Sequence, residues 1–312
     1  MALHVVVGAG PVGTATARLL AARGERVRLV NRRGTGPELA GIERVAMDAA
    51  DGARLTQLST GAVALYNCVN PAYHRWAQDW PPVARALLTA AERTGAVLAV
   101  TGNLYGYGPV SGPMTEATPL AATGSKGQVR NAMWTDALAA HQAGRVRMTE
   151  VRGSDYVGAG SYSMVNVLVL PRVLTGRRAL VPADLDAPHT WTYVGDVART
   201  LVAAALDERA WGRPWHVPSA PAVSIRELAE RAAHLVGAPA PALTRMPYPV
   251  LWLGGLADRV AREMRETAYQ FARPYLMDST SATRTFGITA TPLDESLRES
   301  VEAIRSTPAP VT

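Results

Sequence analysis

The chain has 312 residues with one cysteine, and its 32 Lys and Arg residues against 26 Asp and Glu residues leave a net charge of +6. This length exceeds that of a usual single core, so we expect two lobes. No apolar run reaches the length of a membrane span, and residues 1–20 lack a signal-peptide pattern. One cysteine excludes an internal disulfide and is typical of a reducing compartment. We therefore expect a cytoplasmic protein without a membrane partner.

The positive charge does not indicate a nucleic-acid partner. The arginines are scattered, alternate with acidic residues and form no long basic stripe with interleaved aromatic residues. The only lysine is Lys126, which makes its position worth following. The six histidines have no metal-ligand spacing with each other or with the cysteine, so no metal site is predicted.

The first predicted strand leads into a glycine-rich turn and then a helix-like run that ends at Gly24. Gly8 permits a tight turn, Gly10 lets the backbone approach a pyrophosphate, and Gly13 lets the helix pack close to the strand. The pyrophosphate would lie on the amide groups that open the helix. The predicted cofactor-binding turn therefore comprises Gly8, Gly10, Pro11, Val12 and Gly13.

The second predicted strand ends at Asn31, Arg32 and Arg33. An NAD site usually carries an Asp or Glu here, which binds the 2′-hydroxyl of the ribose. Two guanidinium groups instead suit a 2′-phosphate, which they can hold through charge-assisted hydrogen bonds. The alternative is that both arginines merely end a strand on a solvated surface. Given the glycine motif upstream, we expect NADP rather than NAD.

The first half of the chain alternates strand-length apolar runs with helical patterns. The runs lie at 3–7, 26–30, 62–66, 96–100 and 146–151, and the helical patterns at 14–23, 83–94 and 128–143. This alternation predicts an α/β fold, a Rossmann-type doubly wound parallel sheet. Ligands of such sheets bind outside the carboxyl ends of the strands.

The second half is rich in Pro and Gly, with helical patterns near 196–207, 224–236 and 293–305. It predicts a smaller substrate-binding lobe that is interleaved with the last elements of the sheet. We expect an NADP-binding domain over 1–160 that is completed by segments near 189–217. The smaller lobe would comprise 161–188 and 218–305, and 306–312 would be a flexible tail.

Several short motifs occur in one order along the chain: the glycine turn, Asp48-Ala-Ala-Asp51, Thr101-Gly-Asn-Leu-Tyr105-Gly106, Ser125-Lys126, Arg152-Gly-Ser-Asp-Tyr-Val-Gly158 and Tyr193-Val-Gly-Asp196. In order and spacing they resemble the extended short-chain dehydrogenase/reductase family, the NAD(P)-dependent epimerase/dehydratase-type proteins. The resemblance covers about residues 3–305.

The resemblance implies a role for single positions. Thr101 falls at the family's catalytic Ser/Thr, whose hydroxyl would bind a substrate oxygen. Lys126 matches the lysine that binds the nicotinamide ribose and lowers the pKa of a catalytic tyrosine. Asp48 resembles the acid beside the adenine. The strand end that backs the cofactor comprises Asn67, Cys68 and Asn70.

One departure from the family pattern concerns the acid/base. The family has a tyrosine four residues before the lysine, and this chain has Ala122. The glycine spacing also fits the ordinary dinucleotide fingerprint better than the family's own. Both features indicate an atypical branch, with credible cofactor binding and a proton-transfer mechanism that must differ.

Other residues could supply the missing proton. Tyr105 and Tyr107 follow Thr101, and Tyr73 and His74 follow the preceding strand. Histidine has the pKa best suited to acid/base work near neutrality. For each of these residues the alternative is an ordinary role: a packed aromatic ring, or a solvated histidine.

Three hypotheses follow. The first is an NADP(H)-dependent oxidoreductase or epimerase/dehydratase-like enzyme for a small organic substrate, with a homodimer as the candidate assembly. The second is a non-catalytic NADP(H)-binding sensor, and the third is a redox-neutral enzyme on the same scaffold. The retained Thr101 and Lys126 favour an enzyme, whereas Ala122 favours the sensor.

Overall fold

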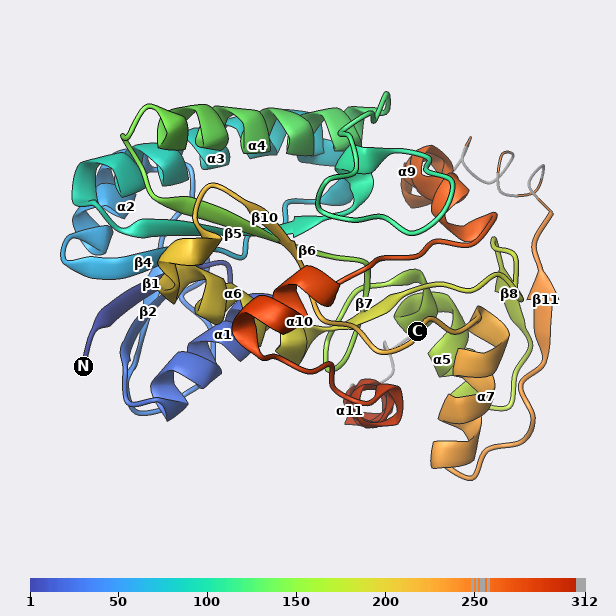
Figure 1. The fold of residues 1–312 in the computed structure, drawn as a ribbon. Helices are drawn as coiled ribbons and strands as arrows, with labels where there is room; N and C mark the ends of the chain where they lie inside the picture. The colour runs from blue at the N-terminus through green and yellow to red at the C-terminus, as the bar shows by residue number, and fades with distance from the viewer. Residues whose placement is uncertain (248–249, 251, 253–255, 257–258, 307–312) are drawn as a thin grey trace.

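The computed structural model describes residues 1–247, 250, 252, 256 and 259–306. Its centre is a parallel sheet of seven strands in the order β10-β6-β5-β4-β1-β2-β3 (Figure 1). The strand order reverses between β1 and β4, which is the switch point where a doubly wound fold binds its ligand. The strands are β1 (Leu3–Val7), β2 (Arg26–Asn31), β3 (Ile42–Ala46), β4 (Ala62–Asn67), β5 (Val97–Asn103), β6 (Met148–Gly153) and β10 (Pro214–His216).

The predicted doubly wound sheet is confirmed, and each apolar run corresponds to a strand. The expected runs do not include β3. This strand lies at the edge of the sheet, and four of its five side chains are polar or only partly buried, so it has no apolar run.

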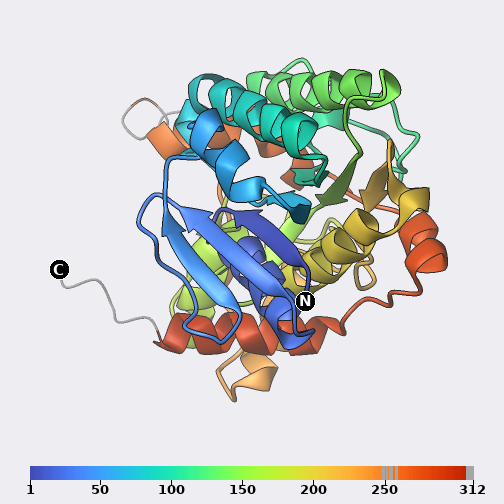
Figure 2. The same ribbon diagram turned by 90° about the vertical axis from the view of Figure 1, so that its left-hand side faces the viewer.

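Helices cover both faces of the sheet, as Figure 2 shows. One face packs against α1 (Pro11–Ala22) and α6 (Val194–Leu206), and the other against α2 (Gly52–Ser59), α3 (Trp76–Thr94) and α4 (Ser125–Gln142). Successive β1 residues serve opposite faces, because Val5 joins one apolar core and Val6 the other. Both faces are therefore buried, as expected for parallel strands.

Helix α3 begins seven residues earlier than the pattern at 83–94 predicts, and it contains Pro81 and Pro82. Trp76 and Trp80, one turn apart, are buried in the core with 4% and 0% exposure. Arg75 and Asp79 form an ion pair over the same turn. Burial of the two indoles holds this turn in helical geometry although the prolines remove two backbone donors.

The smaller lobe has its own apolar core. Two short parallel strand pairs, β7 (Asp155–Val157) with β9 (Trp191–Tyr193) and β8 (Ala179–Val181) with β11 (Leu243–Arg245), lie in this part of the chain. The helices here are α5 (Leu170–Leu174), α7 (Ile225–Leu235), α9 (Arg259–Thr267) and α11 (Leu293–Ser306). Helix α10 (Thr280–Phe286) instead packs against α6 and β10 of the large sheet. Most of the predicted tail, 307–312, lies outside the described residues.

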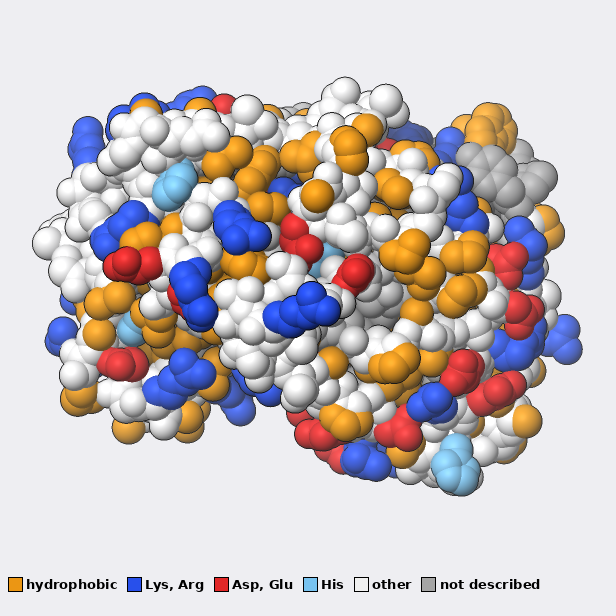
Figure 3. Space-filling view, in the orientation of Figure 1, with side chains coloured by type: hydrophobic (Ala, Val, Ile, Leu, Met, Phe, Trp, Pro, Cys, Tyr) orange, Lys and Arg blue, Asp and Glu red, His pale blue; other side chains and the backbone are white. Residues whose placement is uncertain are grey.

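Among the described residues, no helix is both long and apolar enough to cross a membrane. On the face drawn in Figure 3, basic and acidic side chains are interspersed.

Candidate functional site

The turn between β1 and α1 is tight on one side and open on the other. Gly8 has φ +104°, and its amide donates to Val30 O at 2.8 Å. A Cβ at Gly8 would lie 2.4 Å from the Cys68 carbonyl oxygen, and one at Gly13 would lie 1.9 Å from Gly8 O. A Cβ at Gly10 would meet nothing within 4 Å. Gly8 and Gly13 are therefore required by the fold, whereas the space at Gly10 faces outward.

The open side coincides with the start of α1. Gly10 is the N-cap residue and Pro11 takes the first helical position, where its missing amide costs nothing. The amides of Val12 and Gly13 lie in the first turn, whose donors lack intrahelical acceptors. The helix dipole adds positive potential, so this turn can hold an anionic pyrophosphate.

The residues after β2 form a rigid loop with two exposed guanidinium groups. The Asn31 amide donates to Thr35 O at 2.6 Å, and its oxygen accepts from Arg33 N at 3.1 Å. Arg32 and Arg33 are exposed, and within the described part of the chain neither guanidinium has a hydrogen-bond or ion-pair partner. Asp48, beyond β3, is also exposed and accepts from Ala50 N at 3.0 Å.

The carboxyl end of β4 is mostly structural. Asn67 is buried and caps its own loop by accepting from Val69 N at 3.2 Å, whereas Asn70 is exposed. Burial raises the pKa of the Cys68 thiol to about 11, so Cys68 is a neutral packing residue at pH 7. The Thr101 hydroxyl donates to Cys68 Sγ at 3.7 Å.

A cavity of about 250 Å³ lies beside Ala122. The loop with the short helix η2 (Tyr105–Tyr107), the start of α4, and the end of α9 with η5 (Ala268–Phe271) enclose it. Its lining comprises Tyr105, Gly108, Pro109, residues 122–124, Lys126, Gly127, Glu266, Thr267 and Tyr269.

Lys126 is 2% exposed and is held by two carboxylates of α9. Its Nζ contacts Glu263, and it donates to Glu266 Oε2 at 3.2 Å. Glu266 also accepts from the Lys126 amide at 2.7 Å and from Ser125 Oγ at 2.9 Å. The Lys126 ammonium lies 4.5 Å from the centre of the Tyr73 ring, over its face.

Two of the candidate proton donors form a hydroxyl cluster beside this lysine. Tyr73 Oη lies 3.3 Å from both Tyr105 Oη and Thr267 Oγ1, and its single proton can be donated to one of them at a time. Burial raises the pKa of Tyr73 to about 12 and raises that of Tyr105 well above its usual value of 10. Both phenols are therefore protonated at pH 7 and can donate a hydrogen bond, but neither is a ready base.

The other two candidates lie in different surroundings. His74, in the short helix η1 (Tyr73–Arg75), is exposed, and it has no hydrogen-bond partner among the described residues. Tyr107 is buried, accepts from Arg152 at 2.8 Å and lies 2.7 Å from His216 Nε2. Glu150 pairs with the same arginine at 2.7 Å. Tyr107 thus belongs to a buried polar network that fixes its loop.

The sequence of this chain matches one known protein family. Residues 4–217 match the NAD dependent epimerase/dehydratase family. The chain belongs to this family. A search among curated proteins found no match.

Solved structures of family enzymes share the fold over the whole chain. WbmH from Bordetella bronchiseptica, in complex with NAD+, has a TM-score of 0.77 at 21% identity and covers 99% of this chain and 100% of its own. The dTDP-glucose 4,6-dehydratase of Bacillus anthracis, in complex with NAD, has a TM-score of 0.80 at 14% identity. The match covers 99% of this chain and 98% of the dehydratase chain. The UDP-glucose 4-epimerase of Thermotoga maritima, with UDP-glucose, has a TM-score of 0.79 at 16% identity. The match covers 98% of this chain and 99% of the epimerase chain.

Sequence reasoning did not find Glu263 and Glu266. They lie 137 and 140 residues after Lys126, in a helix of mixed charge whose local pattern predicts a solvated face. One glycine close to Lys126 in the sequence is related to these acids. A Cβ at Gly124 would lie 2.6 Å from Glu266 Oε1, so the close approach of Glu266 favours glycine there. In the described chain no group of three or more His, Cys, Asp or Glu side chains could hold a metal.

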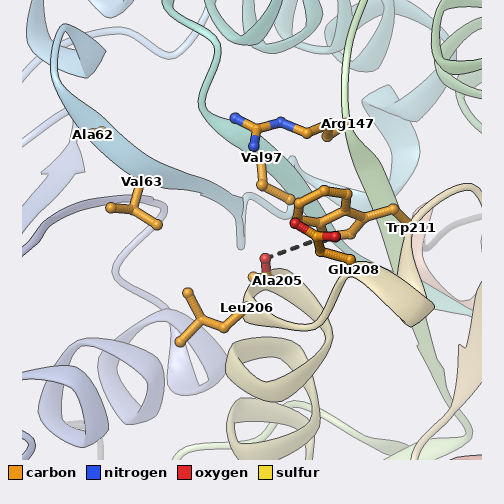
Figure 4. A pocket seen from close by; sticks show the side chains of 8 residues that line it. All are labelled: Ala62, Val63, Val97, Arg147, Ala205, Leu206, Glu208 and Trp211. Carbon is orange, nitrogen blue, oxygen red and sulfur yellow. Dashed lines mark hydrogen bonds between the residues drawn. The ribbon is translucent and has the colours of Figure 1, made fainter. Parts of the chain in front are cut away.

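A second hollow, of about 310 Å³, lies at the opposite edge of the sheet (Figure 4). It opens beside the amino ends of β4 and β5, away from the glycine turn. Its walls are Ala62, Val63, Val97, Arg147, Ala205, Leu206, Glu208 and Trp211. None of the candidate site residues lies there, and ligands of doubly wound sheets bind at the other end.

Proposed function

We propose that this family member is an NADP(H)-dependent oxidoreductase or epimerase/dehydratase-like enzyme that acts on a small organic substrate. The observation that carries the proposal is the open turn at Gly10 together with the two unpartnered arginines that follow β2. The turn fits a pyrophosphate, and two exposed guanidinium groups fit a 2′-phosphate better than a 2′-hydroxyl. Asp48 would lie on the adenine side.

A bound nicotinamide would supply hydride chemistry at the carboxyl ends of β4 and β5. The side chains around it would come from Asn67, Asn70, Thr101 and Lys126. Thr101 would turn its hydroxyl from Cys68 to a substrate oxygen. Lys126 would hold the nicotinamide ribose, and its charge would favour negative charge that develops beside it.

Ala122 removes the usual acid/base, so protons must move by another route. The Tyr73, Tyr105 and Thr267 hydroxyls form a chain beside Lys126 and can donate hydrogen bonds to a substrate oxygen. His74 directly follows Tyr73 in the sequence, and its exposed side chain could exchange protons with solvent. We assign the donor role to these residues because a donor must come within hydrogen-bond reach of the reacting oxygen.

Two observations favour a second candidate, a non-catalytic NADP(H) sensor. Position 122 has no proton to give, and the carboxylates of Glu263 and Glu266 already hold Lys126. A sensor would bind NADPH tightly and turn over no substrate.

Fluorescence titration with NADPH and NADH tests the proposal. The native protein should bind NADPH at least about tenfold more tightly, and Arg32→Ala/Arg33→Ala should remove most of the preference at about 1.5–3 kcal/mol for each charged hydrogen bond lost. The exposed neighbours Arg177 and Arg178 provide a matched control, since their double Ala variant loses the same charge in the other lobe. Equal affinities for the two cofactors in the native protein would contradict NADP selectivity, and binding of neither would refute the function.

A further inference from the structure

Two acidic side chains of α9 dominate the charge beside the cavity. Glu263 and Glu266 face one cation, Lys126, and retain 25% and 26% side-chain exposure, whereas the lysine retains 2%. Helix α9 lies beside the loop that precedes α4 (Figure 1). Two carboxylates pair with one ammonium, so this group carries one formal negative charge in excess.

A third carboxylate adds to the negative potential. Asp155 Oδ2 lies 2.9 Å from His189 Nε2, at the start of β7. Burial is the main cause of the raised pKa of Tyr105 and Tyr269 in the cavity wall, and the charge of Asp155 contributes to both.

The arginines near the cavity lie outside its described lining. Among the described lining residues Lys126 is the only cation. Arg130 donates to Thr101 O at 3.2 Å and lies over the Trp76 and Trp80 rings. Arg152 is buried against Glu150. Arg273 is exposed and acts on Tyr269 from outside the lining.

We infer that Glu263 and Glu266 make this cavity select against phosphorylated substrates, so that it takes a small, flat hydroxyl or carbonyl compound without negative charge rather than a sugar nucleotide. The inference rests on the proposed function, because it assigns the substrate class of the same site. Glu266 lines the cavity, and Glu263 pairs with the lining residue Lys126. Their negative charge repels a diphosphate, and an unfavourable pairing of this kind is an effective source of specificity.

The size and walls of the cavity agree with this assignment. Its volume of about 250 Å³ lies below the range of about 300–1,000 Å³ of pockets that hold drug-sized ligands, which suits a small substrate. The rings of Tyr105 and Tyr269 in its wall provide flat apolar surface with hydroxyl groups.

The direct test is titration of the native protein with UDP-glucose, followed by calorimetry, with and without saturating NADPH. We expect no binding up to about 1 mM. A dissociation constant below that value in either titration would overturn the inference. This result is distinct from failure of the proposed function, which is read from NADPH binding alone.

Charge removal tests the cause. Glu263→Gln/Glu266→Gln keeps the shape of both side chains and removes two negative charges, so UDP-glucose should bind at least about tenfold more tightly than to the native protein. The control, Glu230→Gln/Glu302→Gln, changes the net charge equally at exposed positions of α7 and α11. Binding to the first variant that is no stronger than to the control overturns the role of the α9 acids. If circular dichroism shows that the double variant is misfolded, the single variant Glu263→Gln replaces it. This single variant must then bind UDP-glucose more tightly than the native protein, by a smaller factor than expected for the double variant.

Discussion

Gly10 and Gly13 lie three residues apart in the cofactor turn, and the structure leaves room for a methyl group at only one of them. At Gly13 a Cβ would lie 1.9 Å from Gly8 O, so the backbone must move. At Gly10 a Cβ would enter open space, where the pyrophosphate is expected.

Gly13→Ala should therefore lower the free energy of unfolding, by about 1–3 kcal/mol or more, as overpacking of a tight site does. Gly10→Ala should change it by less than about 1 kcal/mol, since only an N-cap residue is altered, yet should weaken NADPH binding. Urea unfolding and NADPH titration of both variants check this pair. Equal stability losses would show that the turn is looser than the structure indicates.

Lys126 is the second residue whose substitution discriminates between roles. If it binds the nicotinamide ribose, Lys126→Ala should weaken NADPH binding by about tenfold or more, or about 1.4 kcal/mol. Lys126→Arg should restore little of the NADPH affinity, because a planar guanidinium group does not replace a compact ammonium group in a buried site. The measurement is NADPH affinity by fluorescence. Native affinity in Lys126→Ala would mean that the lysine serves only to pair the α9 acids.

At the scale of elements, the network between β6, β10 and the η2 loop makes stability depend on pH. His216 in β10 is 0% exposed and lies between Tyr107 Oη and Asp278 O. Burial lowers the pKa of His216, and this outweighs the opposing influence of Glu116. His4 in β1 is also buried, and burial lowers its pKa too.

These shifts predict a loss of stability in acid. The unfolded histidines bind protons as the pH falls through about 6.5, while the folded ones resist, so the free energy of unfolding should decrease by up to about 1.4 kcal/mol per pH unit for each histidine. His216→Gln should flatten the slope between about pH 6.5 and 5 relative to the native protein. His234→Gln, at an exposed position of α7, is the control and should leave the slope unchanged. Parallel slopes for all three proteins would contradict the prediction.

At the scale of the whole molecule, the two lobes are linked by buried polar contacts. Asp196, at the start of α6 and 1% exposed, accepts from Thr291 N and Thr291 Oγ1, both at 2.7 Å. The contact ties a sheet-covering helix to the segment before α11. A second contact joins α4 to α9, since Glu266 accepts from the amide and the ammonium of Lys126.

Cofactor binding should stabilise the whole chain. A ligand that binds only the folded state adds about 2.7 kcal/mol at a concentration of 100 times its dissociation constant, which shifts the melting temperature by several degrees. Differential scanning fluorimetry should show a larger shift with NADPH than with NADH at equal concentration. No shift with either cofactor would count against nucleotide binding.

The doubly wound sheet and the glycine turn could be predicted from the sequence alone, because each depends on residues that are neighbours in the chain. The 2′-phosphate site at Arg32 and Arg33 stays a prediction. Strands such as β1 are visible as apolar runs, and the spacing of Gly8, Gly10 and Gly13 specifies one turn. It also located Lys126 at a helix start and Ala122 in the place of a tyrosine.

Only the tertiary structure decided what surrounds Lys126. Its partners Glu263 and Glu266 come from a helix more than a hundred residues away, and no local pattern links them. The same holds for the state of Tyr73 and Tyr105, since burial raises their pKa and burial is a property of the packed chain. Helix α3 likewise continues through Pro81 and Pro82 because Trp76 and Trp80 find a core to fill, which local propensity cannot show.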